Sequence, residues 1–352
     1  MPVRTIFVDA MGGDLGPSVC VEGAIGAVHE ATEPMRVALV GVHDELEQTL
    51  TQYYHRHKLE RHESLEIIDA PDFIRMDESP SEVLRRPQTS IRVAMRLMKE
   101  GKGVAVVSTA NTGAVMAAGL AELGRLGSVS RPAIAFMFPS ENGGCLLLDV
   151  GANTLCKTQN LVEFAIMGAC YMQAVRGKAR PRVGLLSIGE EPTKGTDLIV
   201  NTHRALAEGA FDFAFIGNVE GRDVLAGKAD VIVCDGFVGN ILLKFAESLQ
   251  GFLTRAVIRQ IKSNYFSRAG AILMGPFLRR MKKTFDYAEY GGAPLLGLDG
   301  MCLICHGSSN AKAVKNAVWA AASGAEHQVN QHILEALAVC RPVTNGVPAN
   351  QP

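Results

Sequence analysis

Short apolar runs alternate along most of the chain with longer segments whose apolar residues recur at helical spacing. The short runs are typical of buried strands, and the longer segments are typical of amphipathic helices. The pattern predicts strands at residues 5–9, 36–41, 65–69, 104–108, 133–138, 144–150, 182–188, 213–217, 231–235 and 301–305. It predicts helices at residues 17–30, 44–57, 89–100, 114–123, 161–175, 239–261 and 311–322.

This order of elements favours an α/β protein, because strands that alternate with helices form a mostly parallel sheet with helices on both faces. Residues 71–87 are charged and punctuated by prolines, so we expect a loop with at most a short helix. Residues 1–340 are expected to form a single α/β unit. A helical hairpin that reverses at residues 267–270 is expected as an insertion at about residues 251–290, and residues 341–352 as a loose tail.

Turns of small polar residues follow most of the predicted strands. The clearest are residues 9–14, 108–113, 149–153, 189–195, 217–222, 235–240 and 306–310. Open α/β sheets bind ligands outside the carboxyl ends of their strands, so we expect all seven turns to gather at that edge. The turn at 306–310 also opens a helix, whose free backbone N–H groups suit an anion. Such residues are common in any turn, so only the set of turns indicates a site.

Composition narrows the class of protein. The chain has 352 residues, of which 47% are hydrophobic and 20% charged, with a net charge of −1. The neutral balance, one tryptophan and six tyrosines give no indication of a nucleic acid partner. We expect no signal peptide and no transmembrane helix. The eight cysteines lie mostly in apolar runs, which favours a reduced, cytosolic setting.

The sequence does not match the common cofactor-binding motifs. Met11 stands where the dinucleotide-binding pattern requires its first glycine, and Lys194 lacks the preceding glycine of a phosphate-binding loop. Cys302 to His306 matches the haem-attachment string, but on a strand Cys302 and Cys305 point to opposite faces. His55 and His57 fit a solvated helix better than a metal site. We therefore expect no metal and no cofactor.

Residues 279–283 form the densest basic run of the chain and follow an apolar stretch at 271–278. The stretch is too short to span a bilayer. It could lie in an anionic membrane interface, with the cations at the headgroups, or be buried against a second copy of the chain. Both alternatives stay open.

Taken together, the motifs identify a family. They are VDAMGGD at 8–14, NTG at 111–113, LDVGAN at 148–153, IGEE at 188–191 with KG at 194–195, FIGNVEGR at 215–222, VCDGFVGN at 233–240, AEYGGAPLLG at 288–297 and ICHGSSNAK at 304–312. In this order they resemble the PlsX family of bacterial acyl-acyl-carrier-protein:phosphate acyltransferases. The resemblance covers roughly residues 3–338.

The resemblance implies a three-layer α/β/α fold related to isocitrate and isopropylmalate dehydrogenases and to phosphate acetyltransferase. It implies a cytoplasmic homodimer associated with the inner membrane. The implied reaction transfers a long-chain acyl group from acyl carrier protein to inorganic phosphate. The acyl phosphate then feeds glycerol-3-phosphate acylation by a membrane enzyme, at the entry to phospholipid synthesis.

The chemistry of that reaction suggests roles for the polar residues. Lys194 can neutralise a phosphate or an oxyanion, and His306 can protonate the leaving thiolate or merely cap a helix. Oxyanion donors are expected among Asn111, Asn153, Asn218 and Asn240. Aspartates 9, 149 and 235 are expected to orient Lys194, Arg222 and the turn amides. The candidates for phosphate or substrate binding are Asp9, Gly12, Gly13, Asp14, Thr112, Gly113, Asp149, Asn153, Glu190, Asn218, Glu220, Arg222, Asp235, Ser308, Ser309 and Asn310.

Two rival functions remain. A nicotinamide-dependent decarboxylating dehydrogenase would share the fold but would need clustered aspartates for Mg²⁺ and an arginine set for a 2-hydroxy acid. A non-catalytic membrane or carrier-protein scaffold would explain the basic run but not the polar turns. Because carrier proteins are acidic, we expect docking on the basic helix at 89–100, through Arg92, Arg96 and Lys99 with nearby Lys102, Arg85 and Arg86.

Overall fold

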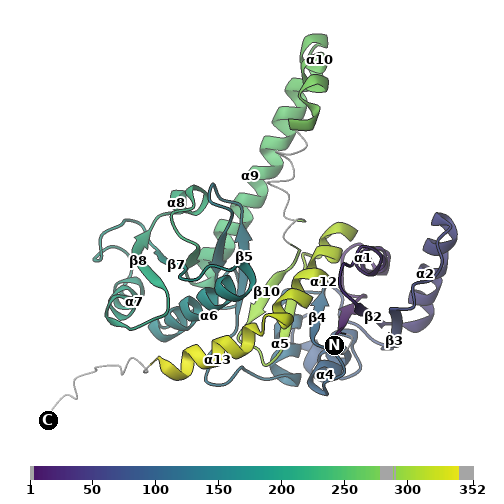
Figure 1. Cartoon of the computed structure of the whole chain (residues 1–352), viewed down its shortest axis with the longest axis horizontal. Helices are drawn as coiled ribbons and strands as arrows, with labels where there is room; N and C mark the ends of the chain where they lie inside the picture. Colours follow the sequence, from purple (N-terminus) through teal and green to yellow (C-terminus); the bar gives the residue numbers. More distant parts are fainter. Residues whose placement is uncertain (1–3, 278–287, 289–290, 341–352) are drawn as a thin grey trace.

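A single sheet of eleven strands runs through the computed structural model, which describes residues 4–277, 288 and 291–340 (Figure 1). Across the sheet the strands follow the order β3-β2-β1-β4-β11-β10-β5-β6-β9-β7-β8. Their bounds are β1 Arg4–Asp9, β2 Met35–Gly41, β3 Leu65–Asp69, β4 Ala105–Ser108, β5 Ala133–Phe138, β6 Cys145–Leu148, β7 Arg182–Leu186, β8 Ala214–Val219, β9 Val231–Val233, β10 Ala293–Leu296 and β11 Met301–Ile304. All ten predicted strands are confirmed. Strand β10 was not predicted, because it is short and contains Pro294.

Helices cover both faces of this sheet, as the alternation predicts. Their bounds are α1 Pro17–His29, α2 His43–His57, α3 Glu82–Arg85, α4 Ser90–Lys99, α5 Thr112–Glu122, α6 Thr158–Arg176, α7 Asp197–Glu208, α8 Gly221–Ala226, α9 Gly236–Lys262, α10 Tyr265–Leu273, α12 Ala311–Glu326 and α13 Val329–Val339. The seven predicted helices are confirmed, and the loop at 71–87 contains only the single turn of α3. Helices α7, α8 and α13 were not predicted.

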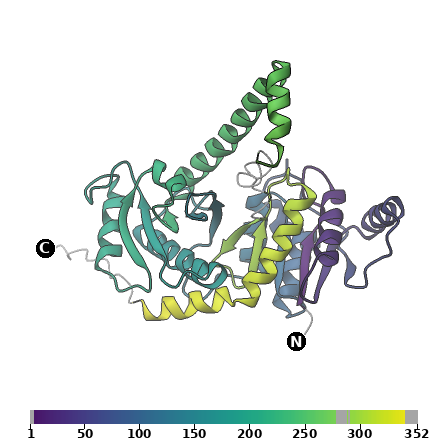
Figure 2. The same cartoon turned by 45° about the horizontal axis from the view of Figure 1, so that its top comes forward.

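The core consists of two apolar layers, one on each face of the sheet. Ile6 and Val8 on β1 face one layer and Phe7 between them faces the other, as the two-residue period of a strand requires. Helices α1, α2, α6, α7, α12 and α13 contribute buried side chains to the first layer, and α4, α5 and α8 contribute to the second. Figure 2 shows α12 and α13 crossing one face of the sheet. The predicted three-layer α/β/α fold is confirmed.

The sheet contains two groups of parallel strands that run in opposite directions. Strands β3, β2, β1, β4 and β11 are parallel to one another, and so are β6, β9, β7 and β8. Between the groups, β10 and β5 make three successive antiparallel pairings, an odd number, which reverses the direction. The polar turns therefore follow strands of two opposite directions, and the prediction that all seven gather at the carboxyl edge of one parallel sheet is wrong. Alternating apolar runs carry no information on strand direction.

Helix α9 leaves the body of the molecule and carries α10 at its far end (Figures 1 and 2). The chain reverses at Ser263 and Asn264, and the Asn264 side chain accepts a hydrogen bond from the Ser267 backbone at 2.8 Å. We predicted the reversal at residues 267–270. That prediction is wrong, because Asn264 caps a helix that includes those residues. The predicted basic cluster, Arg279, Arg280, Lys282 and Lys283, lies outside the described residues.

Candidate functional site

Three polar turns meet beside the ends of the adjacent strands β1, β4 and β11. The Asp14 backbone N–H donates to the Gly307 carbonyl at 3.0 Å. Gly12 and Gly13 allow the first two turns to touch, since a Cβ at Gly12 would lie 2.4 Å from Ala110 Cβ and one at Gly13 would lie 2.8 Å from Thr109 Oγ1. We call this assembly of residues 9–14, 108–113 and 306–310 the first turn cluster.

Asp9 lies at the base of the first turn cluster and is 1% exposed. Its carboxylate accepts hydrogen bonds from the hydroxyls of Ser90 at 2.5 Å and Ser108 at 2.6 Å. Burial raises the pKa of Asp9, and these hydrogen bonds partly oppose that shift. Asp9 contacts neither Lys194 nor Arg222, contrary to our expectation. Its role is to join β1, β4 and α4 beneath the turns.

Two asparagines of the first turn cluster act as helix caps. Asn111 Oδ1 accepts from the backbone of Gly113 at 2.9 Å and of Ala114 at 3.3 Å, at the start of α5. Asn310 Oδ1 accepts from the Ala313 backbone at 3.0 Å, at the start of α12. An asparagine at this position satisfies N–H groups that have no partner within the helix. The cap of α12 is thus Asn310, while Ser308 and Ser309 precede it in the turn.

His306 lies at the exposed rim of the first turn cluster. Its Nδ1 lies 2.7 Å from Ser308 Oγ and 3.2 Å from the Ser308 backbone nitrogen. Its Nε2 lies 3.3 Å from the Nζ of Lys244, a residue that we did not predict. Lys244 follows two leucines in the third turn of α9, and only the fold shows that this turn reaches β11. Through the contact between Lys244 and His306, α9 links the chain that follows β9 to the turn that follows β11.

The turns after β6 and β9 form a second turn cluster, residues 149–153 and 235–240. Asp149 is fully buried and accepts from four backbone N–H groups, those of Ile134 at 3.0 Å, Gly151 at 3.2 Å, Ala152 at 3.1 Å and Asn153 at 2.6 Å. Asn153 Nδ2 donates to Asp149 at 3.0 Å and to the Pro132 carbonyl at 2.7 Å. Both of its amide hydrogens are therefore used, which argues against an oxyanion role for Asn153.

The other side of the second turn cluster is more open. Asp235 caps α9 by accepting from the Phe237 and Val238 backbones, each at 3.0 Å. Asn240 is exposed beside Gly151, and its side chain has no hydrogen-bond partner among the residues that the structure describes. Asn240 thus remains a candidate donor. The expectation that aspartates hold turn amides fits Asp149 and Asp235.

The turns after β7 and β8 form a third turn cluster, residues 189–195 and 217–222. Asn218 is 2% exposed, donates to the Glu191 carbonyl at 2.8 Å and lies 3.0 Å from His203 Nδ1. The His203 contact is made by Asn218 Oδ1, so one amide hydrogen stays unassigned, and it is the burial of Asn218 that argues against a contact with substrate. Arg222 lies 3.1 Å from Glu220 and 3.9 Å from Glu190. Within the described part of the chain, no side chain pairs with the exposed Lys194 ammonium.

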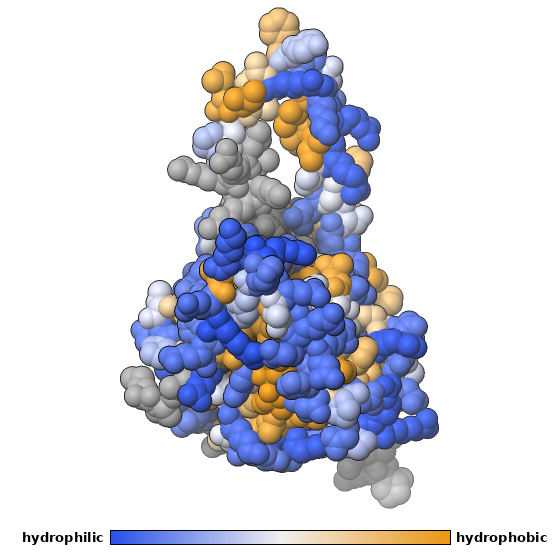
Figure 3. Space-filling model, turned by 90° about the vertical axis from the view of Figure 1, so that its right-hand side faces the viewer, coloured by the Kyte–Doolittle hydropathy of each residue, from blue (hydrophilic) through white to orange (hydrophobic). Residues whose placement is uncertain are grey.

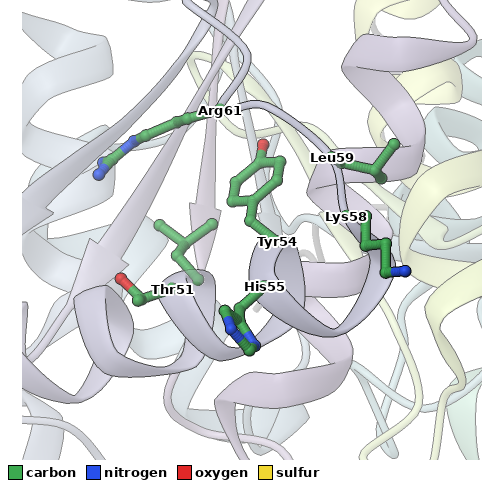
Figure 4. A pocket seen from close by; sticks show the side chains of 7 residues that line it. Thr51, Tyr54, His55, Lys58, Leu59 and Arg61 are labelled. Carbon is green, nitrogen blue, oxygen red and sulfur yellow. The ribbon is translucent and has the colours of Figure 1, made fainter.

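A surface hollow of about 540 Å³ lies elsewhere, against the last turns of α2 (Figure 4). Its lining includes Tyr54, His55, Lys58 and Arg61. Because α2 starts after the carboxyl end of β2 and returns along the sheet, this hollow lies at the opposite edge from the first turn cluster. In the described ranges, no group of histidine, cysteine, aspartate or glutamate side chains could hold a metal ion.

The basic helix expected to dock a carrier protein is largely neutralised. Arg92 and Arg96 both pair with Glu122, at 2.7 and 3.1 Å, and Lys99 donates to the Glu122 carbonyl at 2.5 Å. Arg85, Arg86 and Lys102 also pair with nearby carboxylates. These contacts weaken the case for docking on α4.

Comparison with known proteins identifies the chain. Residues 4–332 match the family described as "Fatty acid synthesis protein", and a phosphate acyltransferase of Heliobacterium modesticaldum is 48% identical over 333 residues, 93% of this chain and 97% of the relative. The chain belongs to this family, the PlsX family. It is therefore an acyltransferase of fatty acid and lipid synthesis, and the predicted resemblance is confirmed.

Solved structures confirm the fold of this PlsX family member. A phosphotransacetylase of Streptococcus pyogenes superposes with a TM-score of 0.59 at 16% identity, covering 94% of each chain. A 4-hydroxythreonine-4-phosphate dehydrogenase of Klebsiella pneumoniae gives 0.55 at 15% identity, covering 92% of this chain and 99% of that one. At such low identity these likenesses show the architecture alone.

Proposed function

We propose that this enzyme transfers a long-chain acyl group from acyl carrier protein to inorganic phosphate, releasing acyl phosphate and the free carrier thiol. The observation that carries the proposal is the family match over nearly the whole chain, joined to a set of open donors in the turn clusters and on α9. Phosphate is itself a nucleophile, so no protein side chain needs to be acylated. The acyl phosphate would then supply glycerol-3-phosphate acylation.

The reaction makes three demands on the site. A phosphate oxygen attacks the thioester carbonyl, the tetrahedral oxyanion needs donors, and the C–S bond breaks to give a thiolate that takes a proton. Lys194, Lys244, His306 and Asn240 are exposed donors suited to these tasks. Asp9, Asp149, Asn153 and Asn218 support the turns instead, because their polar atoms already have protein partners.

The test is incubation of the purified protein with palmitoyl-acyl-carrier protein and labelled phosphate. We expect labelled acyl phosphate and free carrier thiol in equal amounts. If neither forms, the proposed reaction is wrong. The structural likeness to a dehydrogenase is tested in parallel with nicotinamide cofactors and candidate 2-hydroxy acids, where we expect no absorbance change at about 340 nm.

We also propose that the enzyme works as a homodimer at the cytoplasmic surface of the inner membrane. Helix α9 exposes an apolar stripe with helical spacing, which includes Ile241, Phe245, Leu249 and Phe252. Among the described residues, no helix is long and apolar enough to cross a membrane. Exposed stripes of this length are typical of interfaces with another protein.

Helix α10 is the proposed membrane contact. Phe266 is 91% exposed, and Ile272 and Leu273 are 79% and 84% exposed. Figure 3 shows apolar side chains gathered at the end of this projection. Insertion of such side chains beside basic residues gives reversible binding to anionic lipid.

Replacing Ile272 and Leu273 with glutamate separates the two proposed contacts. We expect the variant Ile272→Glu/Leu273→Glu to lose sedimentation with anionic liposomes while remaining a dimer and keeping its activity on soluble substrate. Continued sedimentation would exclude the apolar residues at the end of α10 as the anchor. Dissociation to monomers in analytical ultracentrifugation would instead assign these residues of α10 to the dimer interface.

A further inference from the structure

Two hydrogen-bond donors face each other where α9 passes the first turn cluster. Lys244 Nζ on α9 lies 3.3 Å from His306 Nε2, and these residues belong to chain segments that follow β9 and β11. The two strands belong to the two opposite groups of parallel strands. This contact therefore brings together the two halves of the sheet.

The surroundings of His306 decide which ring nitrogen carries the proton. The Ser308 backbone N–H points at Nδ1 at 3.2 Å, and a backbone N–H can only donate. Nδ1 of a neutral ring must then be the acceptor, so Nε2 carries the hydrogen. The Ser308 hydroxyl, 2.7 Å from the same nitrogen, can donate to it as well.

An Nε2–H group cannot accept a hydrogen bond from Lys244. The lysine ammonium has three hydrogens and no lone pair, and Glu247 Oε2 at 3.0 Å takes one of these hydrogens. His306 and Lys244 thus present two adjacent donors, and none of the residues that the structure describes places an acceptor between them. Both side chains are exposed, with that of Lys244 at 53%, so an oxyanion can reach them.

We propose that the Lys244 ammonium and the His306 Nε2–H together bind one oxygen of inorganic phosphate while another phosphate oxygen attacks the thioester. The inference rests on the proposed function and assigns its phosphate site to the junction of α9 and the β11 turn. One anionic oxygen between two such donors gains a charge-assisted hydrogen bond and a second hydrogen bond. Lys244 and His306 are therefore catalytic residues, since each touches substrate.

The decisive variant is Lys244→Met, which keeps the apolar stem and removes the charge. We expect the dissociation constant for labelled inorganic phosphate, measured by equilibrium dialysis of the full-length protein, to rise by about tenfold or more. The KM for phosphate should rise in parallel, while the KM for acyl-acyl-carrier protein stays within about twofold. Lys244→Arg should restore most of the phosphate affinity because it keeps the charge.

Two further variants serve as matched tests. Lys262→Met removes a cation from the last turn of the same helix, far from His306, and should leave phosphate affinity unchanged. His306→Gln keeps an N–H donor and should weaken phosphate binding less than His306→Leu. Thermal unfolding curves of all variants verify that each one is folded before binding is measured.

The outcomes separate this inference from the proposed function. If the native enzyme makes acyl phosphate but Lys244→Met and Lys244→Arg both bind phosphate normally, the inference is overturned and the proposed function stands. If the native enzyme makes no acyl phosphate yet loses phosphate binding in Lys244→Met, the proposed function fails and the phosphate site stands.

Discussion

Asp9 and Asp149 end or follow strands in opposite halves of the sheet, and both are buried with a pKa raised by burial. Their partners differ. The carboxylate of Asp9 accepts from the hydroxyls of Ser90 and Ser108, which can rotate and become acceptors. The carboxylate of Asp149 accepts from four backbone N–H groups, which can only donate.

The same residue type therefore does different work at the ends of two strands. At Asp149 the fixed donors demand an acceptor on both carboxylate oxygens, so the residue is part of the framework of the second turn cluster. At Asp9 two of the donors are hydroxyls that can rotate and one is the Met11 backbone, so its environment tolerates a change of charge better than that of Asp149. Neither residue faces the open donors at Lys244 and His306, which shows that a buried acid in a polar turn need not be catalytic.

The largest effect is expected from replacing Asp149, whose backbone donors cannot change into acceptors. Asp149→Asn would place an amide NH₂ against backbone N–H groups and leave at least two buried donors unsatisfied. We expect a loss of about 2–5 kcal/mol in the free energy of unfolding, measured by urea titration. A loss below about 1 kcal/mol would mean that these hydrogen bonds do not hold the turn.

Lys194→Ala tests whether the third turn cluster contributes a phosphate contact in addition to the one proposed for Lys244. Lys194 is exposed and pairs with no side chain in the described ranges, so we expect almost no change in stability. If its ammonium also reaches phosphate, the KM for phosphate should rise by roughly tenfold. Unchanged kinetics at limiting phosphate would leave the charge contact to Lys244 alone.

Asp9→Asn tests the carboxylate that accepts from two hydroxyls. We expect a loss of about 1 kcal/mol or less in the free energy of unfolding near neutral pH. Because the pKa of folded Asp9 is raised, the unfolded chain releases this proton first as pH rises. Native stability from this group is then full below the ordinary aspartate pKa and falls as pH rises through the raised value. The deficit of Asp9→Asn in urea titrations should therefore shrink as pH rises above the ordinary aspartate pKa. A deficit that grows with pH would contradict the raised pKa.

The smallest effect concerns metal ions. Both carboxylate oxygens of Asp9 and of Asp149 accept hydrogen bonds from protein donors, and among the described residues no group of histidine, cysteine, aspartate or glutamate side chains could hold a metal ion. Phosphate acyl transfer should therefore keep its full rate after dialysis against a chelator. Activity that is lost on chelation and restored by a divalent ion would contradict this reading of the aspartates.

Local patterns were sufficient for most of the fold. The apolar runs identify ten of the eleven strands, because burial on both faces of a sheet leaves a continuous apolar signature. The hairpin is an exception. Its reversal lies at Asn264 and not at the glycine-containing segment 267–270 that we predicted. A cap is a local signal too, but it competes with glycine as a marker of a turn.

The candidate site was predictable only in part. The sequence by itself determined the family, the residues of the polar turns and the alternation of strands and helices, since these depend on residue type and spacing along the chain. The tertiary structure decided which polar groups were already satisfied, as in Asn153 and Asn218, and which remained open. It alone brought Lys244 to His306, 62 positions apart, because strand direction and the path of a projecting helix follow from packing between distant segments.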